Sequence, residues 1–328
     1  MAMIRFHHGV PPFENCSKRR NMHKALLFLV LSLFVFQCNS TLPSGDKPVV
    51  TVSVLPQLYF LEELAGDLVE VNVMVPPGAS PASYEPDLKQ MALLEQSALY
   101  LNIGSLGFEQ AWLQKIRDLY PELRMVSLAE SIDQIPQQAD DHARQDPGQH
   151  NRENPAHDHD RHAHEHGSLD PHIWMSARNG RIIARDVASA LNELLPEQHA
   201  LIGQRLRKLD SSLQQLDLEI ENRLASLEQR SFMIYHPALG YFARDYQLKQ
   251  HALESEGRAP SVAHMQDMVN LGRKEGIRTV FIQSQFDRAN AETLARSLNA
   301  KVVQIDPLAT DWPSQLKLLS TNLIKAAE

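Results

Sequence analysis

The strongest constraint on the fold is a repeated alternation of strand-like and helical segments. Short β-branched runs, the first from Val49 to Leu55, alternate with amphipathic segments as far as Val126. The alternation stops between Ser176 and Arg230 and returns from Ser231 to Ile305. Such alternation is typical of parallel sheets covered by helices. The sequence therefore predicts an α/β protein with two parallel-sheet lobes.

The stretch between the two lobes predicts a long helix. Apolar residues recur at helical spacing from Leu201 to Ile220 in a charged segment. The predicted helix is far longer than the average helix, so we expect it to join the lobes as a rigid strut. The predicted parts are a leader (1–38), a tether (39–47), an N-terminal lobe (48–136), a disordered histidine-rich loop (137–167), a helical region (168–230) and a C-terminal lobe (231–328).

The N-terminus predicts export. Basic residues at positions 18 to 24 precede an apolar run from Ala25 to Phe36, which is too short to span a bilayer and suits a secretory leader. Cys38 closes this run where a bacterial lipoprotein carries its acylated cysteine, although Gln37 before it matches the usual lipobox poorly. We expect a periplasmic or membrane-anchored lipoprotein held through Cys38; the alternative is a leader that is cleaved elsewhere. The other cysteine, Cys16, falls in or before the leader, so the mature chain has no disulfide.

The composition limits the class of protein. The hydrophobic content of 43% can supply a packed core in each lobe. The net charge is −8 and there is no long basic run, which argues against a nucleic-acid partner.

A polar tract crowded with histidine stands before the segment Asp170-Pro171-His172-Ile173-Trp174. His172 is the first histidine of the apolar, structured region that follows. A histidine at this boundary suggests a metal site beside a flexible histidine reservoir. The tract contains seven histidines, at positions 142, 150, 157, 159, 162, 164 and 166.

Two further residues follow predicted strands of the second lobe. His236 comes after its first strand and Asp306 after its last strand. Ligands of parallel sheets bind beyond the carboxyl ends of the strands, so these side chains can meet His172 in a cleft between the lobes. Imidazole nitrogens and a carboxylate suit zinc. Each of these residues alone is weak evidence for a metal site. A histidine before a proline is more often a structural loop residue, and Asp306 before Pro307 can cap a turn.

Six short stretches stand in a characteristic order along the chain. They are Pro77-Gly78-Ala79-Ser80-Pro81, Tyr84-Glu85-Pro86, Asp170-Pro171-His172-Ile173-Trp174, His236-Pro237-Ala238, Gly240-Tyr241-Phe242-Ala243 and Asp306-Pro307-Leu308. In this order and spacing they resemble the substrate-binding receptors of zinc and manganese ABC importers (cluster A-I). The resemblance extends from Val49 to the C-terminus and implies two lobes joined by one rigid helix. It also implies that His172, His236 and Asp306 are metal ligands, and a histidine-rich loop in this place is a feature of the zinc members.

One position departs from the family pattern. The family has a histidine where this chain has Ala82, in the stretch before Tyr84-Glu85-Pro86. An alanine methyl group cannot bind a metal, so the site keeps at most three of the four family ligands. Candidate substitutes are Glu85, Glu256, a histidine of the tract, or water.

The expected function is reception of a divalent cation, Zn²⁺ before Mn²⁺, and its delivery to an ABC permease. We expect a monomer that contacts the membrane through its lipid anchor and has no enzyme activity. The alternatives are a manganese or iron receptor of the same family, or a metallohydrolase or metal-binding adhesin. The chain has no H-E-x-x-H, G-x-S-x-G or phosphate-binding loop motif. We also expect Trp174 and Trp312 to be packing residues, and His199, His251 and His264 to be solvated.

Overall fold

The computed structural model describes residues 47–137, 169–254 and 259–327. The predicted leader with Cys38, the tether up to residue 46, the histidine-rich loop from residue 138 onward and Glu256 lie outside these ranges. Across the described ranges, every helix is too short or too polar to cross a membrane.

The first sheet contains four parallel strands in the order β2-β1-β3-β4. The central strand β1 is buried because Val50 and Val52 are apolar and lie fully inside the core. Asp87 begins α3, where its side chain accepts a hydrogen bond from the backbone of Gln90. The strands are β1 (Val49–Val52), β2 (Glu70–Val73), β3 (Ser97–Asn102) and β4 (Arg124–Ser127), and the helices between them are α2 (Pro56–Leu64), α3 (Leu88–Glu95) and α4 (Gly107–Leu119).

The second sheet repeats this topology with the strand order β6-β5-β7-β8, again all parallel. Its central strand β7 is buried along its whole length. Its strands are β5 (Ser231–Ile234), β6 (Lys249–Ala252), β7 (Thr279–Gln283) and β8 (Lys301–Ile305), and its helices are α7 (Gly240–Asp245), α8 (Val262–Glu275) and α9 (Arg288–Leu298).

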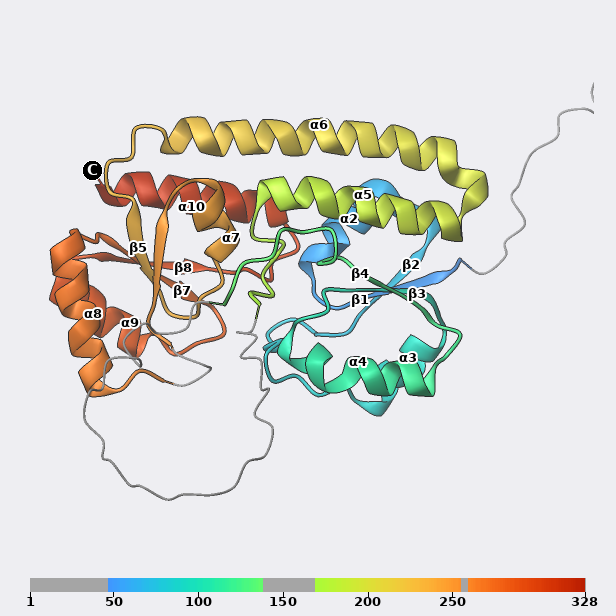
Figure 1. The fold of residues 1–328 in the computed structure, drawn as a ribbon, viewed down its shortest axis with the longest axis horizontal. Coiled ribbons are helices and arrows are strands. Elements are labelled where there is room, and N and C mark those ends of the chain that lie inside the picture. The colour runs from blue at the N-terminus through green and yellow to red at the C-terminus, as the bar shows by residue number, and fades with distance from the viewer. Residues whose placement is uncertain (1–46, 138–168, 255–258, 328) are drawn as a thin grey trace, which may run out of the picture. The chain divides into compact units, whose positions relative to one another are not determined.

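The three longest helices of the described residues are α5 (Ala177–Leu194), α6 (His199–Leu224) and α10 (Trp312–Ala327). Helices α5 and α6 connect the two sheets along the chain, and α10 follows the last strand, β8. In Figure 1, α6 runs alongside α5 and α10, and it packs against both. Helix α6 has 26 residues, and Arg181 of α5 forms a two-pronged ion pair with Asp210 of α6. The predicted fold class, two parallel-sheet lobes joined by a long helix, is therefore confirmed.

Two buried tryptophans tie elements of both lobes together. Trp312 begins α10 and contacts Tyr59 and Phe60 of α2, with ring centroids 5.4 and 5.2 Å apart. Its indole nitrogen donates a hydrogen bond to the carbonyl of Trp174, and the indole nitrogen of Trp174 donates to the carbonyl of Pro307. Both side chains are about 1% exposed, as expected of packing residues. This chain of bonds holds the segment after His172 beside the loop that follows β8.

Candidate metal centre

His172 and His236 lie face to edge although they are 64 positions apart in the sequence. Their ring centroids are 5.1 Å apart and the ring planes meet at 73°. His236 lies two positions after the end of β5, and His172 lies in the irregular segment before α5. The structure thus brings together two of the three side chains that the sequence predicted as ligands.

Both histidines line a cavity of about 760 Å³. One wall consists of first-lobe residues at positions 80–83 and 105–107, together with Gln110. The other wall comes from second-lobe residues that include Glu254, Gln283 and Phe286. Among the described residues of the first-lobe wall there is no histidine, cysteine, aspartate or glutamate. Ala82 is part of this wall, so the position of the missing family histidine faces the same cavity as the two imidazoles.

The ring of His172 is oriented by Asp170. The Oδ1 atom of Asp170 lies 2.7 Å from Nδ1 of His172 and accepts the backbone N–H of His172 at 2.9 Å. Both residues are buried, Asp170 being 3% exposed and His172 9% exposed. The imidazole also packs against Trp174 with ring centroids 5.4 Å apart. This packing and the carboxylate leave Nε2 as the ring nitrogen available to a metal ion.

His236 has a comparable environment in the second lobe. Its Nδ1 atom lies 3.2 Å from each carboxylate oxygen of Glu254. Glu254 is 5% exposed and lines the cavity. The backbone of His236 is fixed by Gln283, whose amide nitrogen donates to the His236 carbonyl at 2.6 Å. Phe286 stacks on the imidazole with ring centroids 5.5 Å apart.

Asp306 lies next to the cavity, directly after β8. Its Oδ1 atom accepts hydrogen bonds from Nε2 of Gln285 at 3.2 Å and from the backbone of Leu308 at 3.1 Å. Pro307 and Leu308 line the cavity wall. Throughout ranges 47–137, 169–254 and 259–327, no three histidine, cysteine or acidic side chains are gathered closely enough to hold an ion. In this arrangement the hydrogen bonds of the Asp306 carboxylate stabilise the loop that follows β8.

The substitutes considered for the missing ligand are placed differently. Glu85 is exposed and is not among the residues that line the cavity. Glu256 lies outside the described residues. Glu254, two positions earlier, is the carboxylate that reaches the cavity and contacts His236.

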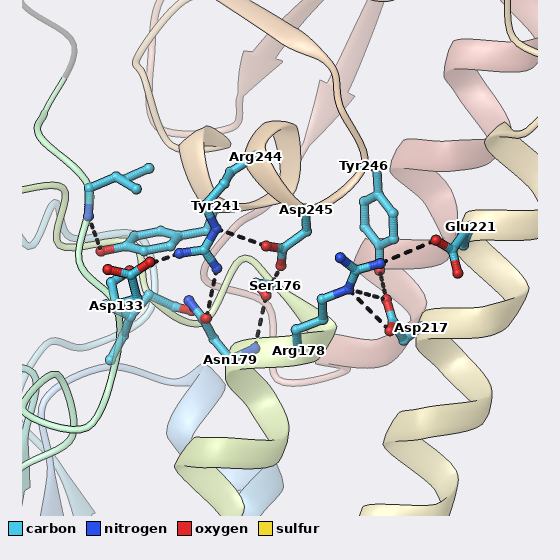
Figure 2. A network of polar contacts seen from close by, with 12 residues as sticks. Asp133, Ser176, Arg178, Asn179, Asp217, Glu221, Tyr241, Arg244, Asp245 and Tyr246 are labelled. Atoms are coloured by element: carbon cyan, nitrogen blue, oxygen red, sulfur yellow. Dashed lines mark hydrogen bonds and ion pairs between the residues drawn. The ribbon is translucent and has the colours of Figure 1, made fainter.

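A polar network fixes α7, the short helix that follows His236 (Figure 2). Arg244 pairs with Asp245 at 2.8 Å and donates to the side chain of Asn179 on α5 at 3.0 Å. Ser176 donates to the same Asp245. Tyr246 donates to Asp217 of α6 at 2.9 Å. Helix α7 is therefore attached to α5, and through Tyr246 at its C-terminal end to α6, which fixes its position relative to the His172 segment.

Tyr241 of α7 connects this network to the candidate site. Its hydroxyl donates a hydrogen bond to the backbone carbonyl of Asp170 at 3.0 Å. Burial raises the pKa of Tyr241 to about 12, so the phenol stays protonated and can act as the donor. The segment that carries His172 is thus bonded to the lobe that carries His236.

The two carboxylates that contact the imidazoles were not predicted from the sequence as their partners. Asp170 belongs to one of the stretches that resemble the family but was not predicted to contact His172, and Glu254 belongs to none of these stretches. A carboxylate two positions before a candidate ligand is a local signal that points to Asp170. No comparable signal exists for Glu254, because its partner lies 18 positions away and meets it only through the pairing of β5 with β6. His251 is also not solvated as predicted, since its side chain is 11% exposed and pairs with Glu275.

Comparison with known proteins identifies the family of this arrangement. The family described as "Zinc-uptake complex component A periplasmic" matches residues 50–326, which is most of the chain. The chain belongs to this family. The solved crystal structure of ZnuA, a protein of the same name as the family, is 32% identical, with a TM-score of 0.74, and the match covers 86% of this chain and 100% of ZnuA.

Other known proteins match over most of this chain. A Chlamydia trachomatis protein named for metal binding is 27% identical over 90% of this chain and 98% of its own length. The zinc-binding lipoprotein AdcA of Streptococcus pneumoniae is 24% identical over 86% of this chain, which spans only 54% of AdcA. A manganese-bound periplasmic metal-binding protein from Candidatus Liberibacter asiaticus shares the fold, with 21% identity, a TM-score of 0.70, and coverage of 86% of this chain and 100% of its own.

Proposed function

We propose that this chain is an exported receptor that binds zinc between its two lobes and delivers it to the permease of an ABC importer. The observation that carries the proposal is the pair of imidazoles, His172 and His236, which face one another in one cavity. Membership of the zinc-uptake family supports the same class of ligand. Two nitrogen donors favour zinc over manganese, which prefers oxygen donors.

The proposed action is binding without chemistry. The two imidazoles supply nitrogen ligands, and Asp306 is proposed as the third ligand after its carboxylate turns from Gln285 toward the ion. Since α6 packs along both α5 and α10, we expect metal release to follow small loop movements rather than wide opening of the lobes. A lipid anchor at Cys38 would keep the receptor near its permease.

Calorimetric titration of zinc and manganese into the mature protein tests this proposal. We expect one tight zinc site, and a loss of affinity on the order of 100-fold or more in His172→Ala and in His236→Ala, because each removes a direct ligand. His251→Ala is the matched control, because His251 is also held by a carboxylate but does not line the cavity. Tight zinc binding that survives both ligand substitutions would refute the assigned site.

A further inference from the structure

We propose that Asp170 and Glu254 are a matched pair of positioning residues that set the tautomer and direction of the two imidazoles. This rests on the proposed function: each histidine presents Nε2 to the metal because a buried carboxylate accepts the hydrogen bond from its Nδ1–H. One carboxylate comes from the segment before α5 and the other from the strand end after β6. Neither was among the predicted ligands.

The first contact has the geometry of a strong, charge-assisted hydrogen bond. Asp170 Oδ1 is 2.7 Å from His172 Nδ1, and the two side chains are 4% and 11% exposed. The same oxygen accepts the backbone N–H of His172, so the carboxylate cannot rotate away from the ring without losing a second bond. Short bonds of this kind are about twice as strong as neutral ones.

The second contact is longer, and its histidine is somewhat more exposed. Both oxygens of Glu254 lie 3.2 Å from His236 Nδ1, with side-chain exposures of 5% for Glu254 and 18% for His236. The backbone N–H of Glu254 donates to the carbonyl of Tyr235 at 2.9 Å. The backbone of Glu254 is therefore anchored to the residue that precedes its histidine.

These contacts select one tautomer. An ionised carboxylate can only accept hydrogen bonds, so in both pairs the proton is on Nδ1 and the lone pair is on Nε2. Metal-binding histidines are commonly held in this way, which fixes the ring and makes Nε2 more basic. The two Nε2 atoms then belong to rings whose centroids are 5.1 Å apart.

Helix α7 provides the space that Asp170 needs. A Cβ atom at Gly240 would lie 2.5 Å from Asp170 Oδ2, closer than packed atoms allow. Tyr241, the next residue, bonds the Asp170 carbonyl. The absence of a side chain at Gly240 therefore lets the carboxylate sit against the second lobe, and Gly240→Ala would displace it without touching either histidine.

The chain offers a control pair outside the cavity. His251 Nε2 lies 2.7 Å from Glu275 Oε2, and neither residue lines the cavity. Removal of Glu275 deletes a partly buried histidine–carboxylate contact. If the loss of any histidine–carboxylate contact lowered zinc affinity, the affinity of Glu275→Ala would fall as well.

The first measurement is zinc affinity by competition with a chelator. We expect Asp170→Ala, Glu254→Ala and Gly240→Ala each to lose about 10–100-fold in affinity, the range typical of outer-shell partners. Asp170→Asn should recover most of the loss, because its amide oxygen can still accept from Nδ1 and the backbone. Glu275→Ala should bind zinc like the wild type. Equal affinity in the wild type and in both Glu254→Ala and Gly240→Ala would overturn the proposal, even if Asp170→Ala failed to fold.

The second measurement needs no metal and separates this inference from the proposed function. Nitrogen-15 NMR of the imidazoles in the zinc-free protein should show the proton of His172 and His236 on Nδ1. In Glu254→Ala the proton of His236 should shift toward Nε2, which a general loss of stability would not cause. Protons on Nε2 in the wild type would refute the positioning role, whereas the expected tautomers without zinc binding would refute the receptor function instead.

Discussion

The two lobes have the same sheet topology but use the carboxyl ends of their strands differently. Strand orders β2-β1-β3-β4 and β6-β5-β7-β8 are equivalent, and the central strand of each is buried. In the second lobe the cavity wall carries His236 and Glu254, with Asp306 beside it. In the first lobe the wall carries serines, a glutamine and Ala82. The fold positions both sets of loops, and the residues in them decide which lobe can bind a metal.

The first lobe does have an acid at this edge, but it is turned inward. Glu109 is fully buried and accepts hydrogen bonds from Ser53 and from the backbone of Ile103, Gly104 and Leu106. Burial raises its pKa, although these hydrogen bonds oppose the rise. Glu109 thus stabilises the loop that forms the first-lobe wall, whereas Glu254 of the second lobe contacts His236 and lines the cavity.

The largest expected effect tests the structural role of Glu109. Glu109→Ala leaves several buried donors without a partner, so we expect the free energy of unfolding to fall by about 3–5 kcal/mol. Glu109→Gln keeps an acceptor of the same shape and should lose less than half as much. Urea denaturation gives both values. A loss below about 1 kcal/mol in Glu109→Ala would show that the first lobe does not depend on this inward acid.

The next effect compares one acid from each lobe. Asp306→Ala removes a proposed ligand, and we expect zinc affinity to fall by about 30-fold. Glu85→Ala changes an exposed first-lobe acid outside the cavity wall, so its zinc affinity should match the wild type. Calorimetric titration of zinc into both variants measures the two affinities. A larger loss of zinc affinity in Glu85→Ala than in Asp306→Ala would indicate that the third ligand comes from the first lobe.

A gain of function sharpens the contrast between the lobes. Ala82→His would add an imidazole to the first-lobe wall, at the position where the family carries one. We expect zinc affinity to rise by about tenfold, because a third nitrogen donor joins His172 and His236. The control is Ser83→His, on the same wall, which should change affinity less. No gain in Ala82→His would mean that the first-lobe loop cannot reach the ion.

The smallest effect concerns pH and an ion pair of the second lobe. Burial raises the pKa of Glu275, but hydrogen bonds from Lys249, Ser231 and His251 outweigh burial and lower the pKa from 4.5 to about 2. A carboxyl whose folded pKa is lowered stabilises the protein above its unfolded pKa. This stability is lost as the pH falls from about 4.5 toward 2.

Because Lys249 is exposed, the contribution is on the order of 1 kcal/mol. Thermal unfolding of Glu275→Gln at pH 7, 4 and 3 should show a smaller decrease with acid than the wild type. Parallel pH profiles for the two proteins would contradict the assignment of this shift to Glu275.

Much of the fold could be predicted from the sequence because its signals are local. The buried run at Val50 and Val52 and the helix start at Asp87 each depend on neighbours along the chain. The pairing of His172 with His236 could be expected from the position of His236 at a strand end. The placement of Asp306 at the edge of the cavity followed from the same rule, and its role as a ligand stays a prediction.

The contacts around the imidazoles could not be predicted in this way. Glu254 meets His236 only because β5 and β6 pair side by side. Glu109 occupies the first turn of a helix, where an acid is ordinarily exposed and interacts with the helix dipole. Its burial depends on Ser53, which is 56 positions away in the sequence. Local patterns do not carry such information.

Crystallography of the zinc-bound protein, with the ion located by its anomalous scattering, tests the central claim most directly. We predict one zinc ion in the cavity, bound by Nε2 of His172 and Nε2 of His236 at about 2.0–2.1 Å, with Asp170 and Glu254 still bonded to the Nδ1 atoms. An ion bound elsewhere, or bound by only one of these two histidines, would contradict it.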